Sequence, residues 1–398
     1  MHNNTRILAT TSLYHALNDG CVAVIPILFP IFKSLFSLSY TQIGILTSGG
    51  LIFTLIAQLV IGRYADGKNF GTLLTLGILL VSASLLLFTQ TTGFVTLIVL
   101  ILIFRMATSF FHPIGVGWIS RTFKRHRLDW AMGIQSGCAD VGAFVAISTT
   151  LFIAEFRGWQ YPLYLWSIGG ILIVFAGISL TSSLPDSLRI VQKNQEKRQL
   201  RTALKDGMKI IKKIHVLIPA FIISGSAWGG ILTYLPLYLD EQTTLSLSMI
   251  GVLVAFWIGS GSIASFFYGS LAALINRKLI LLSCYFFFGL SAILLIVLSN
   301  VFLIAPLLII LGVSSFITFP ALFSFVSEET HESIESTTFA ITFTLQLGGG
   351  TTLLFLSGIL ADIYGIWIPF FLLGSASLAY MILLAGFLNK PLLKADHL

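Results

Sequence analysis

The sequence predicts an all-α polytopic membrane protein with twelve transmembrane helices in two six-helix bundles. Of the 398 residues, 56% are hydrophobic and only 10% are charged, whereas about a quarter of the residues in a soluble domain are charged. Apolar stretches of about 20 residues, the length that crosses about 30 Å of hydrocarbon, recur along the whole chain. The second half also repeats features of the first half at a constant offset.

Twelve apolar stretches are long enough to span a membrane. The first carries His15, Asn18 and Asp19 in its middle and lacks a small-residue cleavage site, so we interpret it as a helix and not as a removable signal peptide. The twelve stretches are residues 7–36, 41–63, 71–90, 93–120, 130–153, 160–182, 214–239, 246–274, 278–298, 301–327, 335–361 and 366–389.

The positive charges predict the orientation of these helices, because Lys and Arg in short loops stay on the cytoplasmic side. With the N-terminus inside, cytoplasmic segments hold 20 of the 23 Lys and Arg residues; Lys33 and Arg157 are external and Arg105 lies within a span. We therefore expect a multi-pass protein of the cytoplasmic (inner) membrane with both termini in the cytoplasm. The net charge of +7 is then a signal for the lipid bilayer and not for nucleic acid.

A shift of 207 residues superimposes the two halves of the chain. The stretch 38–44 matches 245–251, Pro113 matches Pro320, and Gly158 matches Gly365. Because each half contains an even number of spans, the two copies insert in the same orientation as a parallel repeat.

The repeat predicts three segments. They are an N-terminal six-helix bundle (residues 1–184), a cytoplasmic linker (185–213) with nine Lys and Arg residues, and a C-terminal six-helix bundle (214–398).

Two degraded copies of one loop motif follow the second span of each half. The first runs from Gly62 through Ala65, Asp66 and Asn69, and the second from Gly269 through Asn276. In this the chain resembles the major facilitator superfamily, whose corresponding loop reads Gly-x-Leu-Ala-Asp-Arg-x-Gly-Arg-Lys. The resemblance implies alternating access by rocking of the two halves. It also implies that Asp66 helps to lock the outward-facing state.

Two further motifs narrow the resemblance. The His15-x-x-Asn18-Asp19-Gly20 run and the Phe111-His112-Pro113-x-Gly115 run are similar to the fosmidomycin-resistance group of drug exporters. This resemblance implies export. The fifth span lacks the Gly-Pro pairing that is typical of the superfamily's antiporters, so uptake stays open as an alternative.

Five ionisable residues lie within spans of the first half, where each needs a partner or a function. They are His15, Asp19, Arg105, His112 and Asp140, and the 207-residue shift places uncharged residues at all five equivalent positions. We expect Asp19 or Asp140 to take up and release a proton, with His15 and His112 as relays and Arg105 as counter-ion or anion anchor. The alternatives are an ion pair of Arg105 with Asp19 or Asp140 that only holds helices together, and histidines that only pack as satisfied polar groups.

The second half offers an aromatic and nearly neutral surface. We expect an amphipathic substrate to contact this surface together with Arg105 and Asn18. The candidate residues of the second half are Trp228, Trp257, Phe319 and Gln346.

A second set of residues is expected to act in gating. The shift places Arg121 opposite Glu328 and Arg125 opposite Glu332, so a basic loop and an acidic loop are predicted to latch the cytoplasmic side. Gly62 and Asp66 belong to the same set through the loop motif.

These features predict a secondary active transporter that exports a small amphipathic or anionic compound in exchange for protons. Proton-coupled uptake of an organic anion is one alternative, and transport of a divalent metal by His15, Asp19 and His112 is another. No nucleophile or metal motif of a membrane-embedded enzyme occurs, so we expect neither catalysis nor a cofactor nor a resident metal. We expect the protein to act as a monomer.

Overall fold

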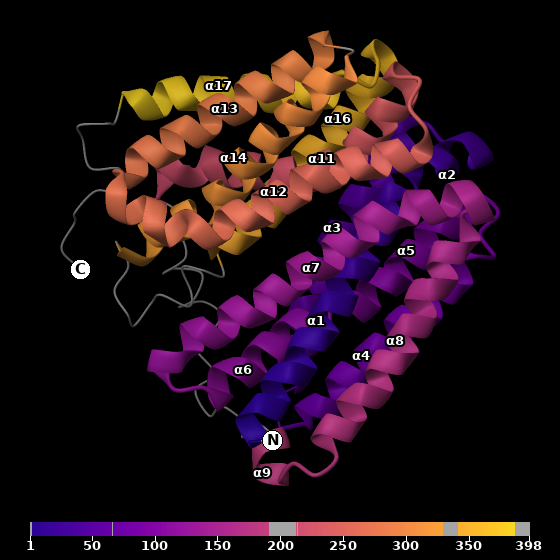
Figure 1. Cartoon of the computed structure of the whole chain (residues 1–398), viewed down its shortest axis with the longest axis vertical. Coiled ribbons are helices and arrows are strands. Elements are labelled where there is room, and N and C mark those ends of the chain that lie inside the picture. Colours follow the sequence, from indigo (N-terminus) through magenta and orange to yellow (C-terminus); the bar gives the residue numbers. More distant parts are fainter. Residues whose placement is uncertain are drawn as a thin grey trace. The chain divides into compact units, whose positions relative to one another are not determined.

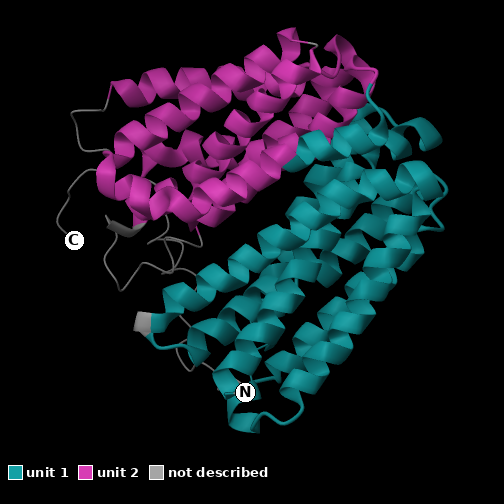
Figure 2. Cartoon of the chain, viewed as in Figure 1, with its two compact units in different colours: residues 1–195, 245–255 teal, residues 196–244, 256–398 magenta. Residues whose placement is uncertain are grey.

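The computed structural model describes residues 2–65, 67–190, 212, 214–298, 300–328 and 341–386, and only the backbone of residues 125, 126, 327 and 328. These residues form helices and short connections, and no β-strand occurs among them. The chain divides into two compact units, residues 1–195 with 245–255 and residues 196–244 with 256–398 (Figure 2). Most of the expected linker, 185–213, lies outside the described residues.

Within each described range of the chain, short connections join successive helices (Figure 1). In the first half of the chain they are α1 (Asn3–Ile27), α2 (Phe29–Phe36), α3 (Tyr40–Ala65), α4 (Phe70–Phe88), α5 (Phe94–Thr108), the π-helix η1 (His112–Val116), α6 (Gly117–Thr122), α7 (Arg125–Arg157), α8 (Gln160–Thr181) and α9 (Asp186–Arg189). In the second half they are the 3₁₀-helix η2 (His215–Leu217), α11 (Ile218–Gln242), α12 (Leu247–Leu274), α13 (Arg277–Val297), α14 (Val301–Glu328), the π-helix η3 (Leu345–Gly349), α16 (Gly350–Tyr364) and α17 (Ile368–Ala385).

The helices have the length and composition of membrane spans. Among the described residues, 11 helical segments are long and apolar enough to cross a membrane, and the bent pair α1 and α2 raises the number to 12. Many large apolar side chains on these helices are exposed, for example Leu59, Phe175 and Phe266. Such exposure is stable in hydrocarbon, so the polytopic membrane fold expected from composition is confirmed.

Proline has different effects on different spans. The first span is a single expected stretch, yet α1 and α2 are bent by 41° at their junction. Pro26 and Pro30 flank this break, and each lacks the backbone N–H that a continuous helix requires. Pro236 and Pro320, in contrast, lie inside α11 and α14 without ending them.

The backbone repeats the 207-residue offset seen in the sequence. The side chain of Asn69 accepts a hydrogen bond from the Thr72 amide at the start of α4, and the equivalent Asn276 caps α13 through the Lys278 amide. Gly158 and Gly365 follow α7 and α16 with φ of 102° and 110°, a region that favours glycine. Equivalent residues therefore begin and end equivalent helices.

Close helix packing follows the same offset. In unit 1, a Cβ atom at Gly142 of α7 would collide with the backbone carbonyl of Ala16 in α1. In unit 2, the equivalent Gly349 of η3 packs against Ile222 of α11. Gly142 thus allows α1, which carries most of the expected polar site, to lie directly against α7.

Candidate functional site

The centre of the candidate site is His15, a buried polar residue of α1. Its side chain is 6% exposed. The Nδ1 atom lies 3.1 Å from the backbone carbonyl oxygen of Gln135 in α7. A carbonyl oxygen only accepts hydrogen bonds, so Nδ1 carries the proton and donates it to Gln135. The Nε2 atom is then the position at which His15 gains or loses a proton.

The Nε2 atom of His15 faces Asp19, one helical turn further along α1. It lies 3.3 Å from Oδ2 of Asp19 and is buried without a hydrogen bond of good geometry. The other oxygen, Oδ1, accepts a hydrogen bond of 2.9 Å from the side-chain amide of Asn18. Asp19 is 32% exposed, so this end of the cluster is accessible while His15 is enclosed.

The second histidine of the sequence motifs joins the same cluster from another helix. His112 is the first residue of η1, and its ring lies 5.3 Å from the His15 ring at an angle of 88°. Phe111 stacks on the face of His15, with a centroid distance of 4.2 Å and an angle of 17°. The structure therefore joins the two motifs, which are 97 residues apart in the sequence, in one contact.

Arg105 occupies a separate place in unit 1. It is 8% exposed and lies against α3, where a Cβ atom at Gly50 would meet its Nε atom at 3.2 Å. Its side chain forms no hydrogen bond or ion pair with any residue that the structure describes. The ion pair with Asp19 or Asp140 that the sequence left open is not formed in this structure.

The remaining expected residues of unit 1 have varied surroundings. Asp140 is half-buried in α7 and has an interaction partner. Gly62 of α3 lies near Pro113 of η1, because a Cβ atom there would be 3.4 Å from the Pro113 Cβ atom. Arg121 is exposed, and its guanidinium lies 5.5 Å from the Phe70 ring centre.

The other gating residues lie outside the description. Asp66 and Glu332 are outside the described residues, as are the side chains of Arg125 and Glu328. The expected latch between the two loops stays a prediction.

The expected residues of unit 2 differ in burial and in the residues that they contact. Trp257 is fully buried and packs edge-on against Phe316 at 5.6 Å, whereas Trp228 and Phe319 are 39% and 44% exposed. The buried Gln346 side chain donates a hydrogen bond of 3.1 Å to Ser224. Their common role as a substrate surface stays a prediction.

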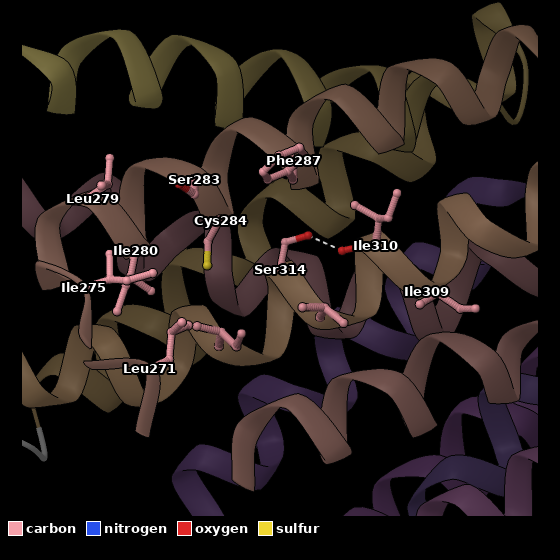
Figure 3. A pocket seen from close by; sticks show the side chains of 12 residues that line it. Leu271, Ile275, Leu279, Ile280, Ser283, Cys284, Phe287, Ile309, Ile310 and Ser314 are labelled. Atoms are coloured by element: carbon pink, nitrogen blue, oxygen red, sulfur yellow. Dashed lines mark hydrogen bonds between the residues drawn. The ribbon is translucent and has the colours of Figure 1, made fainter. Parts of the chain in front are cut away.

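Unit 2 also contains a pocket that sequence reasoning did not identify. It has a volume of about 440 Å³ and is lined by apolar side chains of α12, α13 and α14 (Figure 3). Ser283, Cys284 and Ser314 are the few polar or sulfur-containing residues in its wall, and Ser314 donates its hydroxyl to the Ile310 carbonyl. The pocket lacks charge, so it suits an apolar occupant such as a hydrocarbon chain.

Two partners of His15 were missed by sequence reasoning as well. The Gln135 backbone carbonyl carries no sequence signal, since every residue has one. Phe111 belongs to a motif, but its stacking on His15 depends on the approach of α1 to η1. The Gln135 side chain, polar within an apolar span and buried, is the one feature that could have marked this position.

Comparison with protein families gives a match over most of the chain. The family model described as Major Facilitator Superfamily matches residues 11–352. Two curated relatives match shorter stretches. The MFS-type transporter YfnC of Bacillus subtilis (strain 168) is 30% identical over 121 residues, which is 30% of each chain. The fosmidomycin resistance protein of Escherichia coli (strain K12) is 29% identical over 107 residues, 27% of this chain and 26% of the relative.

Solved structures of transporters share the fold over nearly the whole chain. The nucleoside transporter NupG has a TM-score of 0.81 at 14% identity and covers 97% of this chain and 100% of its own. A peptide transporter, POT, has a TM-score of 0.80 at 15% identity, with coverage of 97% and 95%. A bacterial homologue of the human lysosomal transporter Spinster has a TM-score of 0.76 at 14% identity, with coverage of 98% and 97%.

Proposed function

Because the chain belongs to the Major Facilitator Superfamily, we propose that it is a proton-coupled antiporter that exports a small amphipathic or anionic compound across the cytoplasmic membrane. The observation that carries the proposal is the contact between His15 Nε2 and Asp19 Oδ2 at 3.3 Å inside α1. This contact can hold one proton. When the proton leaves, a carboxylate remains beside an unprotonated imidazole nitrogen. We assign it as the coupling site.

The absence of this contact from the repeat supports a functional role. The residues equivalent to His15 and Asp19 are Ile222 and Ser226, and the Ser226 hydroxyl donates to the Ile222 carbonyl at 2.7 Å. At the positions equivalent to His15 and Asp19, the second unit thus has neutral side chains on the equivalent helix, α11. A buried ionisable pair costs several kcal/mol of insertion free energy, so its retention in one copy is explained better by function than by folding.

Proton exchange at this pair requires a route for the proton and a fixed orientation of the His15 ring. Asp19 is the more accessible member, so we propose that the proton enters and leaves through its carboxylate. Gln135 and Phe111 hold the His15 ring in place. His112 lies beside the ring and is in position to pass the proton onward.

The anionic part of the proposed substrate is assigned to Arg105. A buried guanidinium without a partner among the described residues has five donors in a fixed fork, which suits a carboxylate or phosphate group. This feature supports the uptake of an organic anion as a second candidate equally well, because an anion site does not define the direction of transport.

Transport by purified protein in lipid vesicles tests the proposal. Because one relative is named a fosmidomycin resistance protein, fosmidomycin is the first compound to try, followed by panels of anionic and neutral amphipathic compounds. Antiport predicts that an imposed proton gradient accelerates movement of the compound against the direction of proton flow, with a matching pH change detected by a trapped dye. Movement of compound and protons in the same direction would indicate uptake, and saturable flux indifferent to the gradient would refute proton coupling.

A further inference from the structure

Three potential metal ligands converge in unit 1. His15, Asp19 and His112 each offer one ligand atom, and these atoms all lie within 4.8 Å of one another. Two imidazoles and one carboxylate form a ligand set that is typical of zinc and of neighbouring divalent transition metals. Magnesium and calcium prefer sites made of oxygen atoms alone.

The hydrogen bonding of His15 prepares its second nitrogen for a cation. Because Nδ1 donates to the Gln135 carbonyl at 3.1 Å, neutral His15 has its lone pair on Nε2. Nε2 lies 3.3 Å from the carboxylate oxygen Oδ2 of Asp19, and it is buried without a hydrogen-bond partner in the described part of the chain. Two electron-rich atoms at this distance repel each other unless a positive species lies between them.

The spacing of this pair suits a metal ion. Zinc binds nitrogen and oxygen ligands at about 2.0–2.1 Å, so two ligands of a tetrahedral ion are about 3.4 Å apart. The observed 3.3 Å between Nε2 of His15 and Oδ2 of Asp19 matches this value. The three ligand atoms lie within 4.8 Å of one another, so His112 must approach by up to about 1.4 Å to complete the geometry. Rotation of its side chain can supply this movement because the residue is only half-buried.

Neighbouring groups orient the ligands in the way that groups around metal centres do. The Gln135 carbonyl fixes the ring of His15, and the Asn18 amide holds Oδ1 of Asp19 at 2.9 Å. Arg105, the buried cation of unit 1, forms no hydrogen bond or ion pair with the three residues. The partly exposed Asp19 provides a route for an ion to enter.

We propose that His15, Asp19 and His112 bind one divalent transition-metal ion of the zinc class, at the same atoms that hold the coupling proton. A fourth position, left to water, stays open on the accessible side of Asp19. The metal site does not depend on the substrate or direction of the proposed transport, because it follows from the three ligands and their orienting groups alone.

Direct binding of cobalt and zinc to the tag-free purified protein in detergent tests this site. Co²⁺ gives visible absorption bands whose intensity reports nitrogen and oxygen coordination of low symmetry, and equilibrium dialysis with elemental analysis gives the zinc stoichiometry. We expect one ion per chain in wild-type protein, and at least tenfold weaker binding in H112Q and in D19N. Two independent variants keep the comparison valid where one of them fails to fold.

The matched control is H215Q. His215 is exposed at η2, and its Nδ1 atom also lies near a carbonyl, that of Lys212 at 2.9 Å, but it belongs to no group of three metal ligands in the described part of the chain. We expect H215Q to bind one ion as the wild type does. The proposal is overturned if wild-type protein binds no ion, or if H112Q and D19N fold and bind as tightly as H215Q.

Discussion

In α7, Gly142 lies so close to the carbonyl of Ala16 in α1 that no side chain fits between them. This contact holds the middle of α1 against α7. His15 precedes Ala16 directly, and its Nδ1 atom donates to a carbonyl of α7. The position of the polar cluster around His15 therefore depends on Gly142, which has no functional side chain.

The G142A variant tests this dependence. The added methyl group must push α1 and α7 apart, because the atom it meets is backbone and not the end of a flexible side chain. Overpacking of this kind costs about 1–3 kcal/mol. We expect a lower midpoint of thermal unfolding in detergent.

The matched control is G133A. It lies on the same helix with nothing within 4 Å of the added atom, and alanine favours helix more than glycine does. We expect no loss of stability in this variant. Equal midpoints for G142A and G133A would show that the close approach of the two helices does not support the fold.

The proposed anion site is tested by changes at Arg105. R105Q removes the charge, and we expect at least tenfold weaker binding of anionic compounds with little change for neutral compounds of similar size. R105K keeps the charge but loses the planar fork of donors, so its binding should be intermediate. These affinities are measured by isothermal titration calorimetry, with the compounds that show the highest transport rates.

The control for Arg105 is R157Q. Arg157 is exposed at the end of α7, so we expect its loss to leave the affinity unchanged. Loss of affinity for neutral and anionic compounds alike in R105Q would assign Arg105 a packing role instead of an anion site.

The orientation in the membrane is tested by cysteine labelling in a cysteine-free background. Gln90, between α4 and α5, and Ser182, at the end of α8, are both exposed. With the N-terminus in the cytoplasm, Q90C should react with a membrane-impermeant maleimide in intact cells, and S182C only after the membrane is opened. The reverse pattern would invert the assigned topology.

Much of the fold was predictable from sequence because the bilayer imposes its constraints on every span. Apolar length gave the helices, and the offset of 207 residues predicted that Asn69 and Asn276 occupy equivalent places, where both now cap helices. The effect of proline was not predictable, since Pro26 lies next to a break and Pro320 lies inside a continuous helix. Whether neighbouring groups take over the lost hydrogen bond depends on tertiary packing.

The candidate site was predictable in part. Helical spacing places His15 and Asp19 on one face, and their contact follows from an i, i+4 relationship. The approach of His112 from another span, and the separation of Arg105 from the acidic residues, required the packing of α1, α3 and η1. Two polar residues at a similar depth in the membrane need not be neighbours, because depth does not determine which face of its helix each residue occupies.

Transport by D19N in lipid vesicles tests the coupling role most directly. Exchange of labelled for unlabelled compound at equal pH requires no net proton movement, whereas accumulation driven by a pH gradient does. We expect D19N to retain exchange and to lose gradient-driven accumulation, and D186N, at an exposed residue of α9 that pairs with Arg189, to retain both. Gradient-driven accumulation by D19N at the wild-type rate would contradict the assignment of Asp19 as the coupling carboxylate.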